Sequence, residues 1–283
     1  MKEPILVGAV VYDPKVVVIW DIIKDFFEAN ACPMDYIFFS NYELQVKSLL
    51  GGAIHIAWNS PLAWLDAQRR SGDTCRAIAM RDTDRDRVSH IVCPTDSPLQ
   101  SLADLAGRTL ATGAKDSPQS TLIPLGLLQR NGLEPGRDVQ VKRFDVLVGK
   151  HGDHIGGEKN ALQCMQAGEA DACAMLDLNW QLWTADGTID THRYRVLATT
   201  DRFDHCVFTV RQDLPEALEA PWLETLTSMS YANPAHREMM DMEGLKAWLP
   251  GRTTGFAALA DAVQRQNFFQ TPPLPALGEG VGG

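Results

Sequence analysis

The residues best suited to chemistry lie between Leu110 and Pro124, in the stretch LATGAKDSPQSTLIP. An apolar run typical of a strand ends there in a Gly-Ala-Lys-Asp loop, and a helical apolar pattern begins a few residues later. Between them stand Ser117, Gln119, Ser120 and Thr121. Free backbone N–H groups, hydroxyl groups and the positive end of a helix dipole would meet at this point. The loop therefore either binds an oxyanion such as a phosphonate, phosphate or carboxylate, or serves as an ordinary helix N-cap.

A second cluster of chemically capable side chains is the segment His151-Gly152-Asp153-His154, with Glu158 four residues further on. Imidazole and carboxylate groups are common ligands of divalent metals, so His151, Asp153 and His154 form a candidate metal site. An adjacent Gly-Gly pair makes the segment a flexible loop. The same side chains could instead contact a bound ligand or form a solvated polar surface.

Composition limits the classes of function that are open to the chain. Its 283 residues suffice for two domains, each with its own core. Lys and Arg number 26 against 36 Asp and Glu, which gives a net charge of −10. That balance argues against nucleic-acid partners and anionic membranes, because both require a basic surface. A small anionic ligand stays compatible, because its pocket depends on local donors.

The first residues, MKEPILVGAVVYD, lack the pattern of a signal peptide, and no apolar run reaches the roughly 18 residues of a membrane span. We therefore expect no membrane insertion. The expected location is cytoplasmic for the sequence as it stands, and periplasmic if a signal peptide was removed. The six cysteines are scattered without a C-x-x-C pair, which favours reduced, buried thiols. Cys32 and Cys206 could alternatively act as nucleophiles beside a base.

Strand and helix patterns alternate along the chain and predict an α/β fold of two doubly wound lobes. We expect strands at residues 5–11, 36–39, 53–58, 75–80, 89–93, 110–112, 139–144, 172–176 and 195–199. We expect helices at residues 16–29, 42–50, 61–68, 99–105, 120–130, 159–166, 178–183, 215–230, 235–243 and 256–265. The first lobe would be discontinuous, with residues 1–90 and 201–283, and the second would span residues 91–200. Hinge strands near His90–Cys93 and Val196–Thr199 would join the lobes around a ligand cleft.

In three segments, residues 42–58, 96–111 and 158–171, the chain resembles the substrate-binding proteins of phosphate, phosphite and phosphonate ABC transporters. YELQVKSLLGGAIHIAW, from Tyr42 to Trp58, is similar to a tyrosine, helix and IAW strand of that family. The sequence DSP from Asp96, followed by LADLAGRTLA, resembles the start of its second lobe. EKNALQCMQAGEAD, from Glu158 to Asp171, resembles its NAL segment. Together they extend the resemblance over roughly residues 5–250, and they imply a type 2 periplasmic-binding-protein fold and an ABC permease as partner.

The resemblance also implies which side chains meet the ligand. Tyr42 corresponds to the family's cleft tyrosine, and the Ser117–Thr121 loop corresponds to its Ser-Thr-Ser loop. The family's loop before the NAL segment carries a histidine that contacts the oxyanion, and here His154 or Glu158 could take its place. Asp177 stands where the family has an acidic residue that meets the amino group of aminoalkyl ligands, although it could also cap the helix after it.

The remaining ligand-binding candidates follow from their positions. Asn59 and Ser60 come directly after the IAW strand, at the carboxyl end where α/β clefts bind ligands, and Tyr12 ends the first apolar run. Asn59 replaces a tyrosine that is common in the family. Arg87 falls where many members carry an aromatic residue, and its guanidinium could bind an oxyanion bidentately. The run around it, RDTDRDR, is more typical of a solvated hairpin loop.

Three functions are compatible with these residues. The favoured one is a transporter-type binding protein that holds a small oxyanion-bearing solute between its lobes, with no required cofactor and a divalent metal as the open alternative. The second is a cytoplasmic enzyme on the same fold that transforms a small organic acid, as a decarboxylase or lyase, with metal assistance if the histidine cluster binds an ion. The third is a cytoplasmic ligand sensor that signals through lobe closure.

Overall fold

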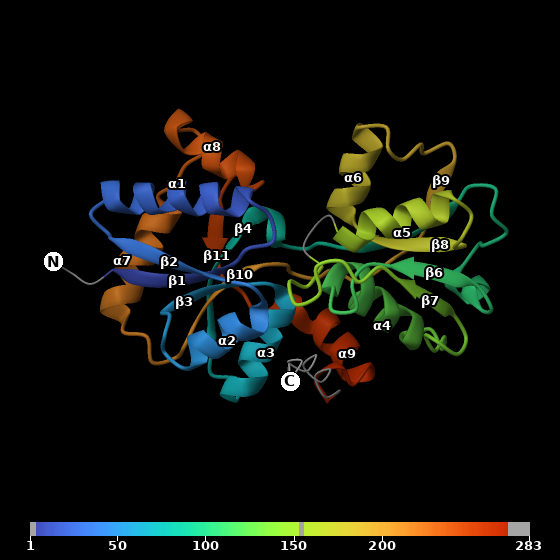
Figure 1. Cartoon of the computed structure of the whole chain (residues 1–283), viewed down its shortest axis with the longest axis horizontal. Helices are drawn as coiled ribbons and strands as arrows, with labels where there is room; N and C mark the ends of the chain where they lie inside the picture. The colour runs from blue at the N-terminus through green and yellow to red at the C-terminus, as the bar shows by residue number, and fades with distance from the viewer. Residues whose placement is uncertain (1–3, 153–155, 271–283) are drawn as a thin grey trace, which may run out of the picture.

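The chain folds into two α/β lobes that lie side by side, each with helices on both faces of a central β-sheet (Figure 1). The structure is a computed structural model that describes residues 4–152 and 156–270. One sheet takes its strands from residues 5–81 and 207–250, and the other takes its strands from residues 89–199. The expected α/β architecture of two lobes is confirmed.

The first lobe contains a mixed sheet of six strands in the order β11-β4-β10-β3-β1-β2. Its strands are β1 (Ile5–Val10), β2 (Met34–Phe39), β3 (Ile56–Asn59), β4 (Arg76–Arg81), β10 (Val207–Val210) and β11 (Trp248–Pro250). β1 pairs in parallel with β2 and β3, whereas β10 runs antiparallel between β3 and β4. Because β1 lies inside the sheet and is covered on both faces, its sequence is an unbroken apolar run.

Helices from two parts of the chain cover the two faces of this sheet (Figure 1). The helices of the first lobe are α1 (Lys15–Ala29), α2 (Tyr42–Leu50), α3 (Pro61–Ser71), α7 (Glu216–Thr227) and α8 (Pro234–Met242). α1, α7 and α8 bury Phe27, Trp222 and Met240 in one core. α2 and α3 bury Val46 and Trp64 in another. The helix α2 begins where the sequence predicts, because the Asn41 side chain accepts a hydrogen bond from the Leu44 N–H at 2.8 Å.

The second lobe repeats the scheme with a mixed sheet of five strands in the order β7-β6-β8-β5-β9. Its strands are β5 (Ser89–Pro94), β6 (Thr109–Thr112), β7 (Gln140–Arg143), β8 (Ala172–Leu176) and β9 (Tyr194–Thr199). Its helices are α4 (Ile123–Arg130), α5 (Gly156–Gln166) and α6 (Asp177–Ala185). β6, β7 and β8 run parallel, so their carboxyl ends share one edge of the sheet.

Two adjacent segments, residues 82–88 and 200–206, connect the lobes. Arg87 and Phe203 join them through a pair of backbone hydrogen bonds of 2.7 and 2.8 Å. β5 begins directly after the first segment and β9 ends directly before the second. Two neighbouring crossings of this kind allow one lobe to rotate relative to the other.

The last described helix, α9 (Ala257–Arg265), packs against both lobes (Figure 1). Its Leu259 shares a buried cluster with Leu62 of the first lobe and Ile123 of the second. Gly126 of α4 permits the close approach, because a Cβ there would lie 2.7 Å from the Cβ of Ala262. The sequence assigned this helix to the first lobe alone.

The structure differs from the sequence expectations in three elements. The helix expected at residues 99–105 is only a short 3₁₀ turn at Leu102–Leu105, closed at its start by Ser101 and Asp104. The strands β10 and β11 were not predicted. β10 is a four-residue strand whose partners β3 and β4 lie far away in sequence, and β11 has three residues at the sheet edge, where its Pro250 is tolerated.

The RDTDRDR run is not a solvated hairpin. It forms a 3₁₀ turn, Asp82–Asp84, in the first crossing segment, and Arg81 and Asp84 are 8% and 2% exposed. Their guanidinium and carboxylate groups pair through Nε and Oδ2 at 2.6 Å and through Nη2 and Oδ1 at 2.9 Å. The charges can be buried because each has a partner.

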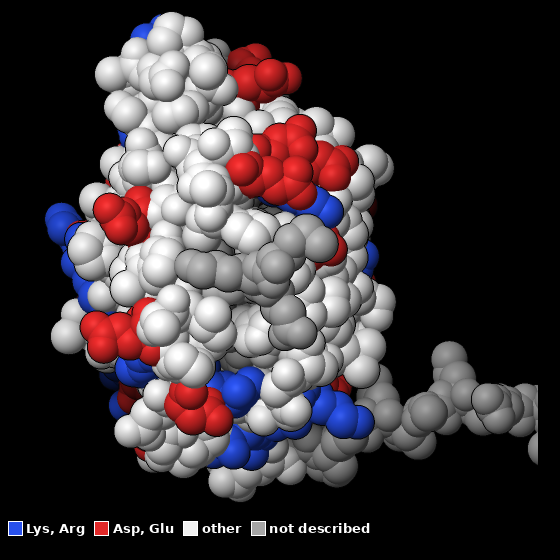
Figure 2. Space-filling view, turned by 90° about the vertical axis from the view of Figure 1, so that its left-hand side faces the viewer, with Lys and Arg blue, Asp and Glu red and all other residues white. Residues whose placement is uncertain are grey.

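Figure 2 shows both acidic and basic side chains on the end of the first lobe that lies away from the second. In this view the acidic groups gather mainly in the upper part and the basic groups mainly in the lower part. The visible face therefore presents no continuous basic surface. None of the helices among the described residues is long and apolar enough to cross a membrane.

Candidate functional site

Three strands of the two sheets end close to contacts between the lobes. β3 ends at Asn59 in the first lobe, and β6 and β8 end at Thr112 and Leu176 in the second. The loops that follow these strand ends carry most of the side chains that the sequence singled out. In α/β proteins this is where ligands bind.

The segment Ser117–Thr121 begins a helix, as expected, with Ser117 at its N-cap. The Ser117 hydroxyl accepts hydrogen bonds from the Ser120 N–H at 3.3 Å and the Ser120 hydroxyl at 2.7 Å. Residues 118–122 form a wide π-type turn before α4, and such turns are frequent at functional sites. Gly113 leaves room for this turn, because a Cβ there would lie 2.1 Å from Ser120 Oγ.

Five buried polar atoms on four of the ligand-binding candidates have no hydrogen-bond partner among the residues that the structure describes. They are Oε1 and Nε2 of Gln119, Oγ1 of Thr121, Nδ2 of Asn59 and Oδ1 of Asp177. All four residues were ligand-binding candidates, and each is less than a tenth exposed. Leaving such a group buried and unpaired costs about 1–3 kcal/mol. A polar ligand would supply the missing partners, so these atoms mark the candidate binding site.

The orientation of the Asn59 amide is fixed by a neighbouring side chain. Gln45 Nε2 donates to the Asn59 Oδ1 and to the Trp58 carbonyl oxygen, both at 2.8 Å. The Asn59 carbonyl is thereby occupied, and its Nδ2 is the group left to donate to a ligand. The sequence analysis did not identify Gln45, although it lies one helical turn after Tyr42 and therefore on the same side of α2.

Arg87 and Asp177 approach each other across the junction of the lobes. Arg87 Nη1 lies 3.3 Å from Asp177 Oδ2, and both side chains are largely buried. Asp177 is the first residue of α6 and does not cap it, because the cap position belongs to Leu176. The alternative that Asp177 serves as the helix cap is therefore wrong. Its second carboxylate oxygen stays available to a ligand that can donate a hydrogen bond.

His151 connects the second lobe to the first. Its ring stacks on Tyr42 with centroids 4.6 Å apart and planes 17° apart, and its Nδ1 forms a short hydrogen bond with the Ser60 hydroxyl. The Tyr42 N–H also donates to the Gly149 carbonyl oxygen at 3.0 Å. The sequence treated His151 only as a metal ligand, but the structure places it against two of the predicted ligand-binding residues.

The buried carboxylate of Asp116, which the sequence analysis did not identify, binds the backbone of the loop that carries Gly149 and His151. Asp116 Oδ2 accepts a hydrogen bond from the Gly149 N–H at 2.6 Å. Burial raises the pKa of the Asp116 carboxyl, and the Gly149 N–H offsets part of that rise. Its position directly before Ser117, in the Gly-Ala-Lys-Asp loop, was the only signal available in the sequence.

The other candidates lie in different surroundings. The Glu158 carboxylate is buried in the second lobe, where Oε2 accepts hydrogen bonds from the Leu176 N–H at 2.9 Å and from Asn179 Nδ2 at 2.7 Å. It therefore supports the junction of β8 and α6. Tyr12 is half-buried and packs against the core of the first lobe. Asp153 and His154 lie outside the described residues.

The sequence matches the model of a known protein family over most of its length. The model for the periplasmic substrate-binding proteins of phosphonate ABC transporters matches residues 13–258. The chain belongs to this family. It is therefore a substrate-binding protein of the ABC-transporter type, in agreement with the resemblance of its motifs.

Solved structures of similar fold cover nearly the whole chain. PhnD1 from Prochlorococcus marinus in complex with methylphosphonate shares 17% identity, has a TM-score of 0.69, and is covered over 98% of its length by 93% of this chain. XAC2383 from Xanthomonas citri bound to ATP shares 17% identity with a TM-score of 0.73 over 94% of this chain and 99% of that one. The aliphatic sulphonate binding protein SsuA from Escherichia coli shares 15% identity with a TM-score of 0.63 over 96% and 90%.

A curated relative matches only a short stretch. An uncharacterized protein from Haemophilus influenzae is 62% identical over 29 residues, which make up 10% of this chain and 41% of that protein. The chain thus spans less than half the length of that relative.

Proposed function

We propose that the chain binds a small solute with an oxyanion of phosphonate, sulfonate, phosphate or carboxylate type between its lobes and delivers it to an ABC permease. The observation that carries the proposal is the group of unpaired buried atoms on Asn59, Gln119, Thr121 and Asp177. These atoms lie at or next to the ends of strands and helices of this chain. The chain belongs to the family of periplasmic substrate-binding proteins of phosphonate ABC transporters. The same fold holds methylphosphonate in PhnD1 and belongs to a sulphonate binding protein in SsuA.

The types of the unpaired atoms support a ligand with two kinds of polar group. Asn59 Nδ2, Gln119 Nε2 and Thr121 Oγ1 can donate hydrogen bonds, as an oxyanion requires. Asp177 Oδ1 and Gln119 Oε1 can only accept, and they suit an N–H or O–H group elsewhere on the ligand. We therefore favour an oxyanion that also carries an amino or hydroxyl group.

A thermal-shift panel tests the proposed ligand class. The panel contains methylphosphonate, 2-aminoethylphosphonate, methanesulfonate, taurine, phosphate, acetate and ATP, the last because XAC2383 binds it. We expect a phosphonate or sulfonate to raise the melting temperature, because a ligand at 100 times its Kd stabilises by about 2.7 kcal/mol. The compounds with an amino group should outperform those without. If no member of the panel shifts the melting temperature, the proposal fails.

The contact of His151 with the first lobe should contribute to ligand affinity. Replacing His151 by Ala removes its stacking on Tyr42 and its hydrogen bond to Ser60, which contribute about 0.5–1.5 kcal/mol each. Because both contacts join the lobes, their loss disfavours the closed form that holds the ligand. We expect roughly tenfold weaker binding of the best panel ligand by calorimetry. The exposed His192→Ala variant is the control, and equal affinities in the two variants would remove His151 from the site.

A further inference from the structure

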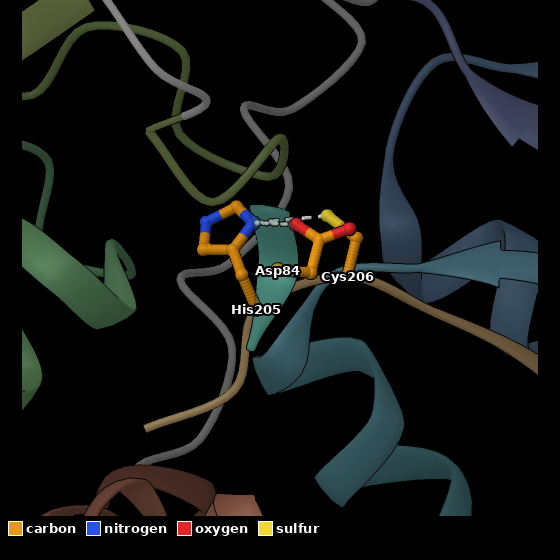
Figure 3. Close-up of side chains that lie close together, drawn as sticks. All are labelled: Asp84, His205 and Cys206. Carbon is orange, nitrogen blue, oxygen red and sulfur yellow. Dashed lines mark hydrogen bonds and ion pairs between the residues drawn. The ribbon is translucent and has the colours of Figure 1, made fainter. Parts of the chain in front are cut away.

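Three side chains from the two crossing segments meet in the first lobe, outside the group of unpaired atoms. Asp84 comes from the first segment, and His205 and Cys206 come from the second (Figure 3). His205 Nδ1 lies 3.1 Å from Cys206 Sγ and 3.5 Å from Asp84 Oδ1, and the three ligand atoms all lie within 4.8 Å of one another. Their exposed fractions are 2%, 4% and 2%. They are the one group of this kind among the residues that the structure describes.

The composition and spacing of this group suit a transition metal. A thiolate, an imidazole nitrogen and a carboxylate oxygen form a typical zinc ligand set, with bonds of about 2.0–2.3 Å. Two ligands of one tetrahedral ion are then separated by roughly 3.5 Å. The observed separations match this value closely enough that one ion could bind all three atoms after small side-chain movements. Figure 3 shows the three side chains facing one another, with the contacts of His205 to Asp84 and Cys206 drawn as dashed lines.

The surroundings of Asp84 provide the outer contacts that metal-binding carboxylates usually have. Arg81 donates hydrogen bonds to both carboxylate oxygens of Asp84, at 2.6 and 2.9 Å. The backbone N–H of His205 donates to the backbone carbonyl oxygen of Asp84 at 2.7 Å. Arg81 also pairs with Glu243 at 2.7 Å. A neighbouring carboxylate, Asp204, is already paired with Arg252 and is therefore not available as a ligand.

The charges of the group balance when an ion is bound. A divalent ion and Arg81 carry three positive charges, and Asp84, Glu243 and the Cys206 thiolate carry three negative charges, with His205 neutral. The buried charges would then be fully compensated, as burial requires.

We propose that Asp84, His205 and Cys206 bind a divalent transition metal of the zinc class, which fastens the two crossing segments to each other. Three protein ligands leave the fourth coordination position to water. The ion would join residues that are more than 100 positions apart in sequence, in the two segments that connect the lobes. It would stiffen this connection and stabilise the first lobe, independently of which solute occupies the cleft.

Metal titration of the whole chain tests the proposal. The protein is stripped with EDTA, dialysed, and titrated with Zn²⁺ or Co²⁺ at micromolar concentration. We expect one ion per chain, a higher melting temperature, and a thiolate-to-cobalt charge-transfer band in the Co²⁺ form. Cys206→Ser and His205→Gln should lose the band and bind Zn²⁺ at least roughly 100-fold more weakly. Cys75→Ser, which changes another buried thiol of the first lobe, should keep the band and the affinity.

Two results would overturn the site. One is wild-type protein that binds less than one equivalent of metal or shows no thiolate-to-cobalt band, and this readout does not depend on whether the variants fold. The other is equal metal affinity in wild-type and Cys206→Ser protein. Solute binding is measured separately on the EDTA-treated protein. A protein that binds no metal can therefore still bind the proposed solute, and a protein that binds no solute can still bind metal.

Discussion

Replacing Gln119 by Met and Thr121 by Val should lower the affinity for the phosphonate or sulfonate ligand roughly 100-fold or more, without destabilising the protein. A hydrogen bond to a charged group contributes about 1.5–3 kcal/mol, and the double variant removes at least two. In the ligand-free protein these side chains have polar atoms without partners among the described residues. Their removal therefore leaves the melting temperature unchanged or raises it. Calorimetry with the best ligand and thermal melts without it measure the two effects.

A matched control separates ligand binding from the general effect of removing a buried hydroxyl. Thr184 also has an unpaired buried Oγ1, but it lies near the end of α6 opposite to Asp177. Thr184→Val should leave the affinity unchanged. If the Gln119 and Thr121 double variant binds as tightly as the wild type, these atoms do not contact the ligand and the proposed site is wrong.

The sequence predicted the fold well because the fold depends on local patterns. The apolar run of β1, the Asn41 cap of α2 and the Ser-Pro-Gln-Ser-Thr turn before α4 each carry a physical signal that acts within a few residues. The strand β10 was not predicted, because its four residues carry no such local signal and become a strand only by pairing with β3 and β4. Its place in the sheet depends on contacts that no local pattern contains.

The sequence singled out part of the candidate site, for the same reason. Asn59, Gln119, Thr121 and Asp177 follow strand ends or begin helices, and their buried unpaired atoms agree with a role in binding. The role of His151 was not visible, because its partner Ser60 lies 91 positions away in sequence. Charge patterns were the most misleading signal.

The RDTDRDR run illustrates this limit. Alternating charges at Arg81 to Arg87 are compatible with a solvated loop, and the sequence favoured that interpretation. Arg81 is buried because Glu243, 162 positions away, and Trp58 complete its surroundings, with the guanidinium carbon 5.2 Å from the Trp58 ring centroid. Whether a charge is buried depends on such distant partners, which spacing along the chain does not reveal.

Arg81→Met should be strongly destabilising, by about 3–5 kcal/mol, because it leaves Asp84 and Glu243 buried without their cation. Chemical denaturation at pH 7 with EDTA present measures this cost without a contribution from bound metal. The exposed pair of Lys246 and Asp241 is the control, and Lys246→Met should leave the free energy of unfolding nearly unchanged. Equal costs in the two variants would show that the Arg81 pair behaves as a surface ion pair.

The pH dependence of the Arg81→Met cost provides a second check on the same carboxylate. Burial tends to raise the pKa of Asp84, but the Arg81 guanidinium, helped by His205, outweighs burial and holds that pKa well below its ordinary value. In the wild type this pair therefore stabilises the fold above the unfolded pKa of about 3.9, and the contribution is lost as the pH falls toward the lower folded value. Without Arg81, Asp84 takes up a proton more readily and escapes the cost of an unpaired charge. The free-energy difference between the wild type and Arg81→Met should accordingly shrink as the pH is lowered from 7 to 4, and a difference that stays constant or grows would contradict the assignment of the cost to the Asp84 charge.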